Sequence, residues 1–158
     1  MRHKVAGRRL NMPADQRKAL LKGLVRNLII NEGIVTTEQK AKEARPIFEK
    51  LVTTAKKGYA GKSFDDMTAD EKAKAVHARR LARKLLPAPK MPREVLAMKG
   101  EKQKEAKKAI RERDAMVKLF ENIAPKLSDK SSGYTRIVKV GFRRGDNASL
   151  VKLEIAFD

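Results

Sequence analysis

The last third of the chain changes its hydrophobic period, and this change constrains the fold more than any other feature. In "LVKLEIAF" apolar side chains occupy alternate positions, at Val151, Leu153, Ile155 and Phe157. The earlier run "YTRIVKV" is also β-prone, and the turn-rich "GFRRGDNAS" lies between the two runs. Two such runs around a turn predict an antiparallel hairpin. A third β-prone run, "GIVTT", supplies a further strand over residues 34–36.

Upstream of the hairpin, apolar residues recur at three- and four-residue steps, as they do in helices. A first helix is predicted over residues 13–31, ended by Gly33 in a left-handed cap. A second runs to about Lys57 from a cap at Thr36 or at Thr37. Pro46 inside this second helix predicts a kink or a restart. The two apolar faces are Leu21, Leu24, Val25, Leu28 and Ile29, and then Ala41, Ala44, Phe48, Leu51, Val52 and Ala55.

A third helix follows a loop over residues 58–70, with Thr68 or Asp70 as its cap. "PAPKMP" then breaks the chain, because proline removes backbone donors and favours an extended backbone. The charged stretch after it reads as one long helix up to Pro125, with a first half that projects. The sequence therefore predicts an α+β fold, a small three-stranded sheet covered by helices on one face. We expect a basic arm over residues 1–12 and a single domain over residues 13–158.

Charge indicates what the protein binds. The chain has 38 Lys and Arg against 19 Asp and Glu, a formal net charge of +19. Such an excess attracts polyanions. No apolar run is long enough to span a membrane, and no secretory signal is evident, so we expect no membrane partner. Nucleic acid is then the favoured partner, although aromatic residues, at 4%, are too scarce for a base-stacking reader of single strands.

The cations are concentrated near the N-terminus. Residues 1–26 contain eight Lys or Arg residues and a single acid, Asp15. Lys18, Lys22 and Arg26 stand four residues apart, without the interleaved glutamates that would pair with them on a helix. For any one lysine a solvated surface is the ordinary explanation. For the whole row, continuous with an arm that has no acid, phosphate binding is the better interpretation.

Catalysis has few candidate groups in this sequence. The two histidines, His3 and His77, stand near arginines and have no evident carboxylate to orient them. The chain has no cysteine, which excludes disulfides and cysteine zinc sites. We therefore expect no catalytic residue, no metal site, no cofactor and no small-molecule substrate. A nucleoid-type DNA-binding protein is the alternative function, and an enzyme acting on nucleic acid would need a carboxylate cluster that is not visible.

Several motifs together resemble one family. "GRRLN", "GIVTTEQKAKEARPIFEKLVTTAKKG", "HARR" and "GYTRIVKVGFRRGDNA" are similar to the bacterial large-subunit ribosomal protein numbered seventeen. The resemblance covers residues 1–58, 77–86 and 114–158. It implies an α+β protein, without catalytic activity, bound to large-subunit ribosomal RNA near the exit of the peptide tunnel. It also implies a cytoplasmic location in the ribosome and neighbouring large-subunit proteins, including number thirty-two.

The resemblance and the charge pattern together give a set of candidate RNA-binding residues. Arg143 and Arg144 would present the hairpin tip to RNA, unless that tip is an ordinary exposed turn. Tyr134 would stack on a base, or else pack at the head of its strand. The full set is Arg2, His3, Lys4, Arg8, Arg9, Arg17, Lys18, Lys22, Arg26, Lys40, Lys42, Arg79, Arg80, Tyr134, Arg136, Arg143 and Arg144. Residues 59–76 and about 87–113 are longer than the family usually has there, and the second stretch reads as a charged helical insertion.

Overall fold

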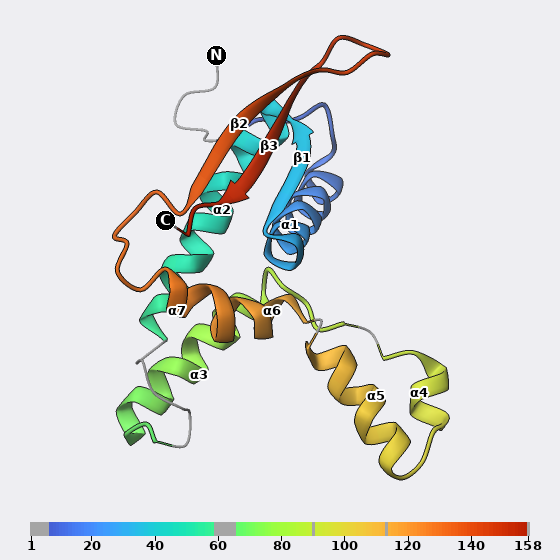
Figure 1. Cartoon of the computed structure of the whole chain (residues 1–158), viewed down its shortest axis with the longest axis vertical. Coiled ribbons are helices and arrows are strands. Elements are labelled where there is room, and N and C mark those ends of the chain that lie inside the picture. The colour runs from blue at the N-terminus through green and yellow to red at the C-terminus, as the bar shows by residue number, and fades with distance from the viewer. Residues whose placement is uncertain (1–6, 59–65, 90, 113, 158) are drawn as a thin grey trace. The chain divides into compact units, whose positions relative to one another are not determined.

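The structure, a computed structural model, describes residues 7–58, 66–89, 91–112 and 114–157. It confirms the α+β class (Figure 1). The chain forms two compact units. The first unit comprises Met1–Lys50 and Ser132–Asp158, and the second is Leu51–Ser131.

The first unit contains the sheet. Its strands are β1 (Gly33–Thr37), β2 (Thr135–Phe142) and β3 (Ser149–Ile155), in the order β1-β3-β2, and both pairings are antiparallel. β2 and β3 form the predicted hairpin, with a register shift between Lys139 and Gly141. The predicted alternation is also confirmed, because Val151, Leu153 and Ile155 are all buried.

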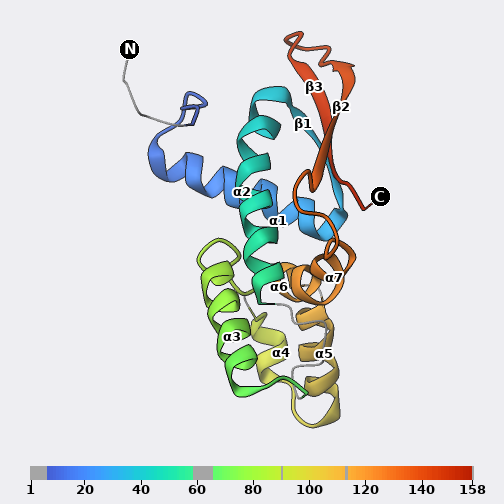
Figure 2. The same cartoon turned by 90° about the vertical axis from the view of Figure 1, so that its left-hand side faces the viewer.

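Helices cover one face of this sheet, as predicted (Figure 2). α1 (Ala14–Asn31) packs on β1 and β3 and buries Val25, Leu28 and Ile29. α2 (Glu38–Lys57) is tied to β2 by the Thr135 hydroxyl, which donates a hydrogen bond to Glu49 Oε1 at 2.9 Å. On the other face Val35 is 62% and Val138 42% exposed. The core therefore lies between the sheet and the two helices.

Two details of the first unit differ from the sequence predictions. The left-handed residue after α1 is Glu32, with φ of 61°, rather than Gly33. Gly33 is already the first residue of β1 and pairs with Glu154, so the chain must turn one residue earlier. The second difference concerns Pro46, because α2 runs through it as one helix and does not restart. α2 begins directly after Thr37, so Thr37 rather than Thr36 stands at its cap position.

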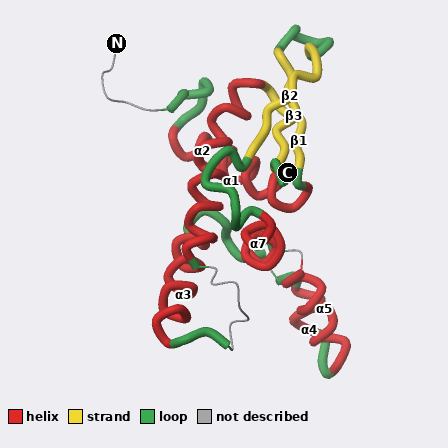
Figure 3. Tube along the Cα trace, turned by 60° about the vertical axis from the view of Figure 1, so that its left-hand side comes forward, coloured by secondary structure: helices red, strands yellow, loops and turns green. Residues whose placement is uncertain are grey.

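The second unit is helical. The end of α2 is followed by α3 (Ala69–Arg83), whose N-terminus has a capping box between Thr68 and Glu71. Loops separate α3 from α4 (Arg93–Ala97) and α4 from α5 (Glu101–Glu112) (Figure 3). The last helical segments follow one another without a gap and are α6 (Ala115–Lys118), the π-helical turn η1 (Leu119–Ile123) and α7 (Ala124–Lys126). Its largest buried side chains include Leu86, Leu119, Ile123 and Leu127.

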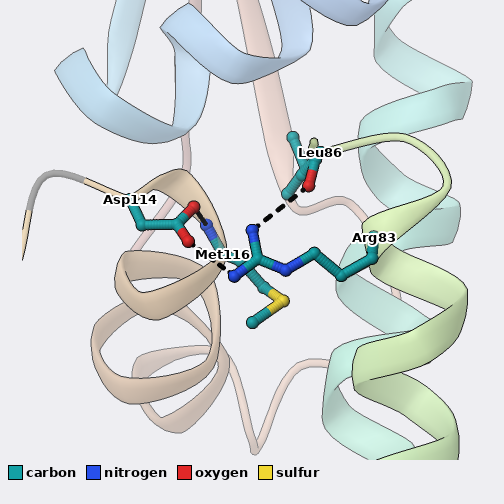
Figure 4. A network of polar contacts seen from close by, with 4 residues as sticks. All are labelled: Arg83, Leu86, Asp114 and Met116. Atoms are coloured by element: carbon teal, nitrogen blue, oxygen red, sulfur yellow. Dashed lines mark hydrogen bonds and ion pairs between the residues drawn. The ribbon is translucent and has the colours of Figure 1, made fainter. Parts of the chain in front are cut away.

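The single long helix predicted up to Pro125 is wrong, because Asp114 interrupts it. The Asp114 backbone is extended, and its carboxylate accepts a hydrogen bond from the Met116 N–H at 3.0 Å, so it caps a new helix. Asp114 is only 5% exposed and also accepts a 2.7 Å bond from Arg83 Nη2 (Figure 4). Arg83 and Asp114 flank the charged insertion at about residues 87–113, so this ion pair links the two ends of the insertion.

Candidate nucleic-acid interface

A row of cations lies along α1, and its first two members, Lys18 and Lys22, precede Val25, the first residue that the helix buries. Lys18 and Lys22 are exposed and Arg26 is half-buried. At 1.5 Å of rise per residue, neighbours four apart are displaced by about 6 Å along the helix axis. None of the three has an acidic partner among the residues that the structure describes. Their charge is therefore available to a ligand outside the chain.

The described end of the basic arm is attached to the first unit. Arg17 Nη1 donates a hydrogen bond to the Arg8 carbonyl at 3.3 Å, and Arg8 Nε lies 3.7 Å from a Glu43 carboxylate oxygen. Arg9 is exposed. Of the other candidates in the arm, Arg2, His3 and Lys4 lie outside the described residues.

Two lysines near the start of α2 differ in their surroundings. Lys42 Nζ lies 2.6 Å from a Glu38 carboxylate oxygen, one helical turn away. This hydrogen bond is the main reason why the pKa of Glu38 lies below its ordinary value. Lys40 is half-buried and has no acidic partner in the described part of the chain. Lys40 is thus better suited than Lys42 to contact a phosphate.

The arginines of the hairpin also divide into those paired with an acid and one that is not. Arg136 Nε and Lys152 Nζ both lie 2.8 Å from the Glu154 carboxylate. The hydrogen bond from Lys152 is the largest cause that holds the pKa of Glu154 below its ordinary value, and the hydrogen bond from Arg136 is the second. At the tip, Arg143 Nε donates to Asp146 Oδ1 at 2.7 Å while Arg143 Nη2 pairs with Oδ2. This two-point contact is the main reason why the pKa of Asp146 is lowered to about 2, and a hydrogen bond from the Ala148 N–H adds to it. Arg144 is exposed and has no acidic partner among the described residues.

Burial favours one of the two roles that the sequence left open for Tyr134. The residue is only 4% exposed, which supports packing at the head of β2 over stacking on a base. In the second unit, Arg79 lies over the Phe120 ring at 5.4 Å from the centroid, whereas Arg80 is exposed. The cations of the candidate set that lack an acidic partner within the described ranges are Arg9, Arg17, Lys18, Lys22, Arg26, Lys40, Arg80 and Arg144.

The second unit contains a groove that sequence reasoning missed. It has a volume of about 500 Å³ and is lined by Thr54 and Lys57 of α2 and by Lys74, His77, Ala78 and Leu81 of α3. The signal was present in the sequence, because the α3 residues follow the i, i+3, i+4, i+7 spacing of one helix face. Their partner face on α2 could not be identified without the structure.

The fold and the placement of its cations are typical of proteins that bind polyanions. Two helices cover a small sheet, and a row of unmatched cations faces outward, as in proteins that bind polyanions. The described residues contain no group of three or more His, Cys, Asp or Glu that could hold a metal ion. Within the same residues, no helix is long and apolar enough to cross a bilayer.

Comparison with known proteins gives the family. Residues 20–156 match the family model described as Ribosomal protein L17. The chain is 40% identical over 147 residues to the large ribosomal subunit protein bL17 of an Exiguobacterium species, an alignment that covers 93% of this chain and 96% of the relative. It is 39% identical over 154 residues to the bL17 of Allorhizobium ampelinum, covering 98% and 81%. The chain belongs to the ribosomal protein L17 family, which confirms the resemblance seen in the sequence.

Proposed function

We propose that this protein is a structural constituent of the large ribosomal subunit, in the cytoplasm, and that it binds large-subunit ribosomal RNA. The observation that carries the proposal is the row Lys18, Lys22 and Arg26, exposed or half-buried and without an acidic partner in the described part of the chain. A structural protein of this kind needs cations that reach RNA phosphates without first giving up an internal partner. The family membership supports the same function.

Other candidates extend this interface from the α1 row. Arg9 and Lys40, in the same unit, add charge to the arm and to α2, and Arg144 adds it at the hairpin tip. Arg8, Lys42, Arg136 and Arg143 are already paired with acids, so we assign them a smaller part in affinity. The proposed partners beyond RNA are neighbouring large-subunit proteins, including number thirty-two, as the family resemblance implies. The DNA-binding alternative has no support from the relatives, which are ribosomal proteins.

The salt dependence of RNA binding tests this function. Binding of the full chain to large-subunit ribosomal RNA is measured between 50 and 200 mM salt, for wild type and for the triple variant Lys18→Gln, Lys22→Gln, Arg26→Gln. Loss of three phosphate contacts should flatten the slope of log affinity against log salt by about 2 to 3. The control is Lys102→Gln, Lys107→Gln, Lys108→Gln, which removes the same charge from the exposed surface of α5. An equal change in both variants would contradict a specific role for α1.

A further inference from the structure

Two helices approach each other closely beside the groove of the second unit. Gly58 follows α2, and a Cβ atom placed on it would lie 2.5 Å from Ala78 Cβ and 3.3 Å from Ala75 Cα. Ala75 and Ala78 are both buried on α3. Small residues at the contact let the end of α2 and the middle of α3 come together. The groove lies next to this contact and shares Ala78 with it.

The chemistry of the groove is that of a basic rim around an apolar floor. Lys57, Lys74 and His77 supply the basic groups, and none of the described residues that line the groove is acidic. None of these three has an acidic partner among the described residues. Leu81, at 38% exposed, is a large apolar side chain that the fold leaves open to solvent beside them.

We propose that this groove binds one unstacked nucleotide of the ribosomal RNA. Lys57 and Lys74 would hold a phosphate, and the base would lie against Leu81 and Ala78 with the His77 ring beside it. A base has an apolar face and the backbone an anionic charge, so a nucleotide matches both parts of the lining, and histidine rings are among the groups on which proteins stack bases. The volume of about 500 Å³ lies in the range of small-ligand sites.

A nucleotide fits this lining better than a protein segment does. An apolar peptide would leave the lysine charges at the rim without a counterion, whereas RNA supplies a phosphate at every residue. The inference rests on the proposed function, because the nucleotide is taken to belong to ribosomal RNA. The groove would add a second type of RNA contact to the proposed function, since the α1 row would bind only phosphates and the groove would also hold a base.

Site-specific crosslinking distinguishes this inference from the proposed function. A photoreactive phenylalanine analogue is placed at Leu81, or at Lys22 on α1, in the full chain, and large subunits assembled with it are irradiated. Crosslinks to ribosomal RNA from both positions are expected, with Leu81 reaching a single short RNA segment. RNA crosslinks from Lys22 alone, or a Leu81 crosslink to a protein, would overturn the groove proposal and leave the proposed function standing. Absence of RNA crosslinks from both positions would overturn both.

Substitutions then test the chemistry of the groove. Leu81→Glu puts a carboxylate on the apolar floor and should weaken RNA binding about fivefold or more, the loss expected for one stacked base. Lys57→Gln with Lys74→Gln should also weaken binding, more than the control pair Lys84→Gln with Lys99→Gln, which removes two exposed charges of the same unit away from the groove. Circular dichroism confirms that each variant folds. Unchanged affinity in the folded Leu81→Glu variant, or equal losses in both lysine pairs, would overturn the proposal.

Discussion

At the scale of single residues, the hairpin tip shows why two adjacent arginines are not equivalent. Arg143 is held by Asp146, whereas Arg144 is exposed without an acidic partner among the described residues. Their order in "RRGD" does not reveal this difference, because either arginine could reach an acid two or three residues away. The three-residue spacing and the turn geometry select Arg143.

This pairing makes a prediction about pH. The pKa of Asp146 is lowered from 3.8 to about 2, so the pair's contribution to stability is fully present above pH 3.8 and is lost as the pH falls through about 2. In Arg143→Gln the pKa of the carboxyl should rise from about 2 toward 3.8, since its main hydrogen-bond donor is gone and only the Ala148 N–H still bonds to it. The measurement is an NMR titration of the Asp146 side-chain carbon. Arg144→Gln is the control and should leave the midpoint at about 2; equal midpoints in both variants would refute the assignment.

Two glycines give a matched test of packing. At Gly58 an added methyl group would collide with Ala78 Cβ at 2.5 Å, so Gly58→Ala should destabilise the protein by about 1 to 3 kcal/mol, as overpacking does. At Gly23, inside α1, no atom lies within 4 Å of the added Cβ. Gly23→Ala should stabilise the protein by up to about 1 kcal/mol, because alanine favours the helix. Urea unfolding measures both, and a Gly58→Ala variant as stable as wild type would contradict the close helix contact.

At the scale of elements, the sequence predicted those that local spacing determines. Val151, Leu153 and Ile155 gave β3 through their alternation, and Phe48 with its neighbours gave the buried face of α2. Of the two caps that the sequence offered for α3, Thr68 and Asp70, the structure has Thr68, in a capping box with Glu71 three residues away.

The failures at this scale have long-range causes. Asp114 ends the predicted long helix, and it is held by Arg83, which is 31 residues away in the sequence. Gly33 is not the cap of α1, because strand pairing with Glu154 takes it into the sheet. In both places a distant partner decides between two locally acceptable conformations. The groove was missed in the same way, because its walls come from two helices separated by residues 58–68.

At the scale of the whole molecule, a net charge of +19 predicts a polyanionic partner but does not say which cations meet it. The structure divides the candidates into those that an acid already neutralises, such as Lys42 and Arg136, and those that it leaves unmatched, such as Lys18 and Lys22. Net charge governs long-range attraction, whereas unmatched cations at fixed spacing determine where phosphates sit.

The most direct test of this account is the chemical reactivity of the α1 lysines in the ribosome. Free protein and assembled large subunits are treated with acetic anhydride, and acetylation is measured for each lysine by mass spectrometry. In the free protein Lys18 and Lys22 should react readily, because both are exposed. In the subunit both should be strongly protected, and release of the protein at high salt should restore their reactivity. Equal acetylation of Lys18 and Lys22 in the two states would contradict the claim that α1 binds ribosomal RNA.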